Sequence, residues 1–107
     1  MEHRVIEVGG SIRIDVQLSG APGRPWMVLL HALGERADDW GAVAEHFAST
    51  YRVAAVDLRG HGRSEWPGEY AFERMRDDVL GVLDGLVAAR CGARRAFAGW
   101  CRRLPGR

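Results

Sequence analysis

The sequence contains no lysine and no asparagine, and all 15 of its basic residues are arginine. Such a bias is what GC-rich coding DNA produces. No apolar run approaches the roughly 20 residues that span a membrane. The N-terminus also lacks the basic segment and apolar core of a secretory signal. We therefore predict a cytoplasmic protein without a membrane segment.

Cysteine is also scarce. Cys91 and Cys101 are the only two in 107 residues, and without an export signal they predict no structural disulfide. Their spacing matches no zinc motif, and the four histidines are scattered along the chain. The sequence therefore predicts no metal site and no cofactor.

Acidic residues are absent from the C-terminal end. Residues 1–89 hold all 14 acidic residues and nine arginines, a balance of −5, whereas residues 90–107 hold six arginines, a balance of +6. A basic tail can neutralise phosphates, but this one lacks the interleaved aromatic residues of a single-strand binder. We expect residues 102–107 to form an irregular tail without a nucleic-acid partner.

The overall composition, with 47% hydrophobic and 27% charged residues, is that of one small domain. Alternating apolar residues over 4–8 and 12–18 predict a β-hairpin, with Gly9 and Gly10 in a two-residue turn. Continuous apolar runs are typical of strands buried on both faces of a parallel sheet. Three such runs follow, at residues 26–30, 52–56 and 95–98.

Two segments carry the period of a helix. The first is predicted to be capped by Asp38, and its apolar stripe consists of Trp40, Val43, Ala44 and Phe47. The second runs from about residue 70 to 89, with a predicted Arg74–Asp78 ion pair. The order of elements predicts the α/β class: a β-hairpin followed by parallel strands with crossover helices.

Open α/β sheets bind ligands outside the carboxyl ends of their strands, where three loops of this chain lie. With "MVLLHALG", "DDW", "YRVAAVDLRGHGRSEWP" and a strand that ends in Gly99, residues 5–101 resemble the α/β-hydrolases. The resemblance covers only the N-terminal part of that fold and implies a partial domain over residues 1–101. It implies a small-molecule substrate, and esters, amides, epoxides and haloalkanes all stay open.

The resemblance also implies roles for the residues of the loop that follows the first parallel strand. The backbone N–H of Leu33 stands at the place of an oxyanion-hole donor, since a preorganised N–H stabilises charge that develops on a substrate oxygen. By the same resemblance, His31 and Gly34 are structural residues that stabilise this loop. Ala32 replaces the glycine that the family usually has.

The loop after the second parallel strand resembles the family's structural D-x-R-G-H-G-x-S motif. Its members are Asp57, Arg59, Gly60, His61, Gly62 and Ser64. Gly62 and Ser64 also begin a G-x-S-x-G nucleophile elbow, but Trp66 replaces the closing glycine, so we expect Ser64 to be structural. A phosphate cradle in this loop is the weaker alternative, because no helix N-terminus follows directly.

The third loop, at residues 99–101, matches the first half of the family's G-x-nucleophile-x-G elbow. Cys101 stands at the nucleophile's position, but Arg103 stands where the strained turn needs a small residue. The family's acid and histidine come after the nucleophile, and no such residues follow Cys101 in this sequence. We therefore expect the chain to be inactive alone.

Three interpretations stay open. The first is the N-terminal piece of a hydrolase, ended by a truncation or a frameshift. The second is a non-enzymatic α/β module that binds a partner, or a second copy of itself, through an exposed sheet edge. The third is a minimal thiol hydrolase in which Cys101 is the nucleophile.

Overall fold

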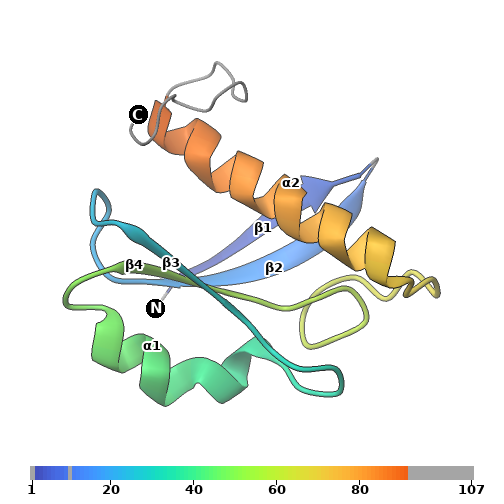
Figure 1. Cartoon of the computed structure of the whole chain (residues 1–107), viewed down its shortest axis with the longest axis horizontal. Coiled ribbons are helices and arrows are strands. Elements are labelled where there is room, and N and C mark those ends of the chain that lie inside the picture. Colours follow the sequence, from blue (N-terminus) through green and yellow to red (C-terminus); the bar gives the residue numbers. More distant parts are fainter. Residues whose placement is uncertain (1, 10, 92–107) are drawn as a thin grey trace.

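The computed structural model describes residues 2–9 and 11–91, the last four of them as backbone only. A four-stranded mixed sheet forms the middle layer (Figure 1). Its strands are β1 (Glu2–Val8), β2 (Ile12–Ser19), β3 (Trp26–Leu30) and β4 (Arg52–Val56). The strand order is β1-β2-β4-β3, in which β2 pairs antiparallel with β1 and β4, and β3 pairs parallel with β4.

Helices cover both faces of the sheet. The 3₁₀ turn η1 (Ala37–Trp40) and helix α1 (Gly41–Phe47) cover one face, and helix α2 (Phe72–Cys91) crosses the other (Figure 1). The predicted α/β class, with a hairpin and parallel strands joined by a crossover helix, is confirmed. The predicted strand at residues 95–98 and the basic tail lie outside the described residues.

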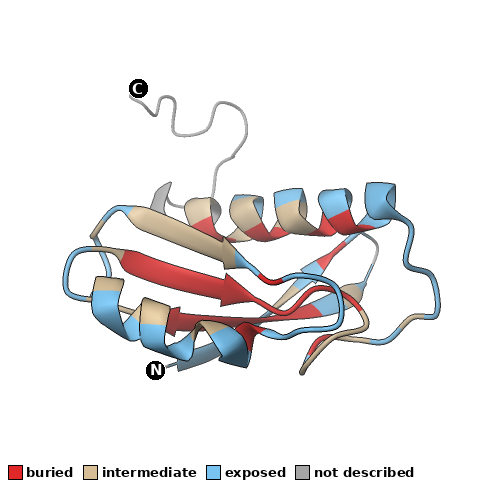
Figure 2. Ribbon diagram, turned by 60° about the horizontal axis from the view of Figure 1, so that its bottom comes forward, coloured by how far each residue is buried: buried red, intermediate tan, exposed pale blue. Residues whose placement is uncertain are grey.

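The main core lies between α2 and the sheet. Each fully buried aliphatic side chain contributes about 1.5–3 kcal/mol relative to exposure. The buried members of this core are Val8, Ile14, Val16, Leu18, Ala54, Val56, Val82 and Leu86. All five residues of β4 are buried, because β4 has a strand on each side and a helix layer on each face (Figure 2). By contrast, β3 lies at the edge of the described sheet and is only half-buried.

The apolar stripe predicted for the first helix is confirmed. Its four residues are half-buried, whereas the positions between them are exposed. The predicted cap is wrong, because the carboxylate of Asp39, and not that of Asp38, accepts a hydrogen bond from the backbone N–H of Arg36 at 3.2 Å. Asp38 accepts instead from the amide of Gln17 at 2.5 Å, and this hydrogen bond, together with Arg63, lowers the pKa of Asp38.

The predicted two-residue hairpin turn is also wrong. Because β1 ends at Val8 and β2 begins at Ile12, three residues connect the strands. The backbone N–H of Ser11 donates to the carbonyl of Val8 at 3.0 Å, and Gly9 has a φ of +46°. The alternation over residues 12–18 marks the start of β2 correctly, but Ser11 belongs to the connection, which the two glycines alone do not fill.

Two glycines allow α2 to lie close against β1. A Cβ on Gly81 would lie 2.8 and 2.9 Å from side-chain atoms of Val8, and a Cβ on Gly85 would lie 3.0 Å from a methyl carbon of Ile6. In a helix each glycine is about 1 kcal/mol less favourable than alanine. The close approach of helix and strand is the physical reason for their presence here.

Replacing Gly81 by alanine should lower the free energy of unfolding by about 1 kcal/mol. Overpacking against buried Val8 costs roughly 1–3 kcal/mol, which exceeds the gain in helix propensity of about 1 kcal/mol. Gly85→Ala is the matched control, since the half-buried side chain of Ile6 can move aside, and it should be neutral or stabilising. Urea unfolding followed by circular dichroism measures both. A higher midpoint for Gly81→Ala would contradict the packing explanation.

Candidate functional site

The loops that follow β3 and β4 lie side by side, because these strands are parallel neighbours. The rings of His31 and His61 are in contact, with 4.8 Å between their centroids. The backbone N–H of Leu58 donates to Nε2 of His31 at 3.0 Å, and the backbone N–H of Gly34 donates to Nε2 of His61 at 2.9 Å. Each loop therefore supplies a histidine that accepts a hydrogen bond from the backbone of the other.

Both imidazole rings have a defined tautomer. Nδ1 of His31 lies 2.8 Å from the carbonyl oxygen of Ala32, and Nδ1 of His61 lies 2.9 Å from that of Arg59. A carbonyl oxygen can only accept, so Nδ1 carries the hydrogen in both rings. The lone pair on each Nε2 is taken up by a backbone N–H, so in this arrangement neither ring can act as a general base.

Asp57 joins three segments of the chain. Its side chain is 1% exposed, with Oδ1 accepting from the N–H of Ala37 at 2.7 Å and Oδ2 from the N–H of Arg63 at 3.1 Å. Its own N–H donates to the carbonyl of Asp15 at 3.0 Å. Gly62 passes directly over this carboxylate with a φ of +52°, and a Cβ there would lie 2.5 Å from Oδ2. The loop therefore requires glycine at this position.

The hydroxyl of Ser64 is used within the fold. Ser64 is 3% exposed, and its Oγ accepts from the N–H of Asp15 at 2.8 Å and donates to the carbonyl of Asp57. In the same loop, the N–H of Gly60 donates to the carbonyl of Glu65 at 2.8 Å. With both of its hydrogen-bonding roles filled by the backbone, the Ser64 hydroxyl is not presented to a substrate.

A buried ion pair links this loop to α2. Nε of Arg59 donates to Oδ2 of Asp78 at 2.5 Å and its second terminal nitrogen to Oδ1 at 2.8 Å, with side-chain exposures of 6% and 3%. The predicted Arg74–Asp78 pair is therefore wrong. Arg74 pairs instead with Glu69, at 3.2 Å on the surface.

The sequence does hold a signal for this burial. Asp78 falls three residues after Met75 and four before Val82, both of which are buried on the sheet-facing side of α2. A carboxylate on the apolar face of a helix needs a partner from elsewhere in the fold. Helical periodicity alone could have indicated burial, but not that the partner is Arg59.

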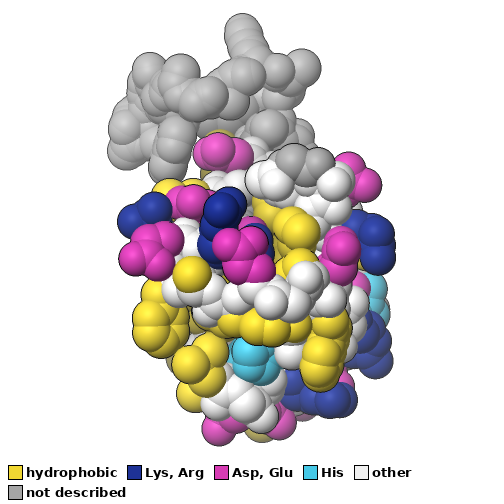
Figure 3. Space-filling model, turned by 90° about the vertical axis from the view of Figure 1, so that its right-hand side faces the viewer, with side chains coloured by type: hydrophobic (Ala, Val, Ile, Leu, Met, Phe, Trp, Pro, Cys, Tyr) yellow, Lys and Arg dark blue, Asp and Glu magenta, His cyan; other side chains and the backbone are white. Residues whose placement is uncertain are grey.

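An apolar groove of about 390 Å³ opens beside the loop after β3. It lies between that loop, the end of β3 and the first turns of α2, and Leu30, Leu33, Phe72 and Val79 are among the residues that line it. Leu33 is 56% and Phe72 is 70% exposed. Figure 3 looks onto this end of the molecule, where hydrophobic side chains gather around a histidine.

Within residues 2–9 and 11–91, no helix is long and apolar enough to cross a membrane. The same residues form no group of three His, Cys, Asp or Glu side chains that could hold a metal ion. The predicted elbow residues Gly99 and Cys101 lie outside the described part of the chain.

The residues of β3, β4 and the two histidine loops match a known protein family. A family model described as the alpha/beta hydrolase fold matches residues 25–87. The chain belongs to the α/β-hydrolase family. The matched segment of this α/β-hydrolase contains both histidine loops, η1, α1 and most of α2.

Several α/β-hydrolases resemble the chain. Epoxide hydrolase 4 of Mus musculus is 35% identical over 83 residues, which are 75% of this chain and 23% of that protein. 3-Oxoadipate enol-lactonase 1 of Acinetobacter baylyi is 33% identical over 73 residues, which are 68% and 27%. The crystal structure of the enol-lactonase from Burkholderia xenovorans LB400 superposes with a TM-score of 0.72 at 34% identity, over 79% of this chain and 34% of that one. The chain spans about a quarter of the length of these curated relatives.

Proposed function

We propose that the chain carries the oxyanion-hole loop of a hydrolase that acts on small ester-like substrates or on related ones such as epoxides and enol-lactones. The observation that carries this proposal is the reciprocal bracing of the two loops by His31 and His61. His61 holds the N–H of Gly34, directly after Leu33, so the loop is fixed before a substrate arrives. A fixed N–H at Leu33 would stabilise a developing oxyanion without reorganisation.

In this proposal residues 1–101 are the N-terminal part of a hydrolase domain, and Cys101 marks the nucleophile's position. A complete triad also needs an acid and a histidine after the nucleophile, which this sequence does not hold after Cys101, and a lone nucleophile without a positioned base gives little catalysis. The 107-residue chain is then inactive alone. The similarity to hydrolases about four times as long supports this proposal. The cytoplasmic location stays a prediction.

Hydrolysis of p-nitrophenyl acetate tests the proposed inactivity. The chain and its Cys101→Ala variant should show the same rate, close to that of the buffer, because no base activates the thiol. A rate that depends on Cys101 would overturn the proposal and support the minimal thiol hydrolase.

A second candidate function is association through the sheet edge. Among the described residues β3 pairs only with β4, and its five apolar side chains are half-buried or exposed. An apolar strand with an open edge can pair with a second copy of the chain. Light scattering after size-exclusion chromatography should then show a dimer whose share rises with concentration. A folded monomer at all concentrations would contradict this function.

A further inference from the structure

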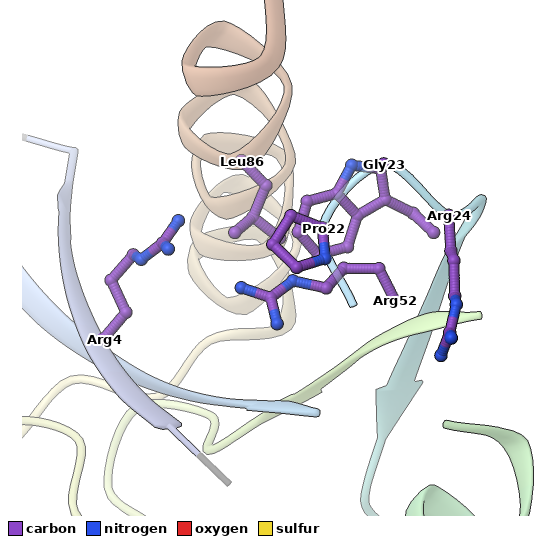
Figure 4. Close-up of a pocket in the computed structure, with 7 residues that line it drawn as sticks. Arg4, Pro22, Gly23, Arg24, Arg52 and Leu86 are labelled. Atoms are coloured by element: carbon purple, nitrogen blue, oxygen red, sulfur yellow. The ribbon is translucent and has the colours of Figure 1, made fainter. Parts of the chain in front are cut away.

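A second hollow, of about 200 Å³, lies at the opposite end of the sheet, where β3 and β4 begin (Figure 4). Arg4 of β1, Trp26 of β3 and Arg52 of β4 line it, together with Leu86 of α2 and the loop residues 22–24. Cationic and apolar groups therefore meet in one small space. None of these residues contributes to the loops described above.

The two strand arginines face each other across the hollow. Figure 4 shows the guanidinium groups of Arg4 and Arg52 pointing toward one another, while Arg24 points away. Arg24 donates to the carbonyl of Ala48, outside the hollow. Arg52 is held firmly, because its side chain is 9% exposed and donates to the carbonyl of Gly20 at 2.6 Å. The hollow therefore has one buried cation, Arg52, and one partly exposed cation, Arg4.

A carboxylate already bridges these two cations. Oε2 of Glu2 accepts from Arg4 at 3.2 Å, and Oε1 accepts from Arg52 at 3.2 Å. The separation of the two guanidinium groups thus fits a carboxylate that gives one oxygen to each. The hydrogen bonds from Arg4 and then Arg52 lower the pKa of Glu2. The Glu2 side chain is 51% exposed, so it can turn outward into solvent.

The rest of the hollow is suited to an apolar group. The indole of Trp26 lies beside Arg52, whose guanidinium carbon is 6.0 Å from the ring centroid, and Pro22 and Leu86 supply further apolar surface. Pockets for drug-sized ligands measure roughly 300–1,000 Å³, so this hollow would take a smaller molecule. A planar acid would place its carboxylate on the arginines and its ring against the indole.

We propose that Arg4 and Arg52 bind the carboxylate of a small organic acid, whose apolar body packs against Trp26, Pro22 and Leu86. When no ligand is bound, the carboxylate of Glu2 binds both guanidinium groups. When a ligand binds, the Glu2 side chain turns outward into solvent. This site is independent of the hydrolase proposal, because it lies at the other end of the sheet and uses different residues.

Isothermal titration calorimetry of the 107-residue chain with benzoate tests the proposal. Glu2→Gln removes the competing carboxylate, so it should bind benzoate about tenfold more tightly than the unaltered chain. In the Glu2→Gln background, Arg4→Gln should weaken binding by about tenfold or more, because one charged donor is lost. Arg13→Gln is the matched control and should leave the affinity unchanged, because Arg13 is exposed, pairs with Glu65 and is not among the residues that line the hollow.

Two further probes separate the contributions of charge and apolar body. Benzamide keeps the ring without the charge, and inorganic phosphate keeps a charge without the ring. Both should bind at least about tenfold more weakly than benzoate. Equal binding of benzamide or phosphate, or an unchanged affinity in Glu2→Gln, would overturn the proposal. If circular dichroism shows that Arg4→Gln does not fold, Arg4→Met replaces it, since it also removes the charged donor, and unchanged benzoate binding by that variant would equally overturn the site.

Discussion

Replacing Gly62 by alanine is expected to lower the free energy of unfolding by about 2–5 kcal/mol. The left-handed φ of +52° alone costs a residue with a Cβ about 1–2 kcal/mol. The new methyl group would also collide with the carboxylate of Asp57 and push it away from the N–H groups of Ala37 and Arg63. A buried carboxylate that loses hydrogen bonds costs roughly a further 1–3 kcal/mol.

Gly68→Ala is the matched control for this variant. Gly68 also has a left-handed φ, of +87°, but among the described residues other than its chain neighbours no atom lies within 4 Å of the position that its Cβ would take. It should lose only the conformational part, about 1–2 kcal/mol. Urea unfolding monitored by far-ultraviolet circular dichroism gives both values. Equal losses in the two variants would show that the contact with Asp57 contributes nothing.

Replacing Asp78 by alanine is expected to destabilise the fold by about 3–5 kcal/mol. This change leaves the guanidinium of Arg59 buried with its charge unpaired. The hydrogen bond that Arg59 donates to Asp78 raises the pKa of Arg59, so the guanidinium keeps its charge and needs a partner in the folded state. The measurement is again the unfolding free energy in urea, at neutral pH.

Two variants control for the Asp78 result. Arg74→Ala removes a surface ion pair with Glu69 and should cost less than about 1 kcal/mol. Arg59→Met combined with Asp78→Leu replaces the buried pair by apolar groups and should recover most of the lost stability. An Asp78→Ala loss as small as that of Arg74→Ala would show that the pair is not buried in solution.

The regular elements could be predicted from local patterns. The apolar runs at residues 26–30 and 52–56 coincide with β3 and β4 at both ends, because buried parallel strands leave an uninterrupted apolar signal. The predicted helix over residues 70–89 overlaps α2 with shifts of two residues at each end. Turns and helix caps are harder to predict from local patterns. The predicted turn is wrong at Ser11, and the predicted cap is wrong at Asp38.

The partners of polar side chains could not be predicted in the same way. Asp78 binds Arg59 across 19 positions, and Asp38 binds Gln17 across 21. Helical spacing suggests only neighbours three or four positions away, such as Arg74. Resemblance to a family identified the residues of both loops, but their reciprocal histidine bonds depend on β3 and β4 being parallel neighbours. That arrangement is a property of the whole sheet.

The strand order has a consequence for how the chain is made. A nascent protein emerges N-terminus first, so the hairpin and β3 leave the ribosome before β4 does. Yet β4 lies between β2 and β3 and pairs with both. The apolar segment Trp26–Leu30 therefore stays without its strand partner until residues 52–56 have been synthesised, and during that interval it is a candidate ligand for a chaperone. The sheet is completed from the inside, when the last of its four described strands enters at the centre.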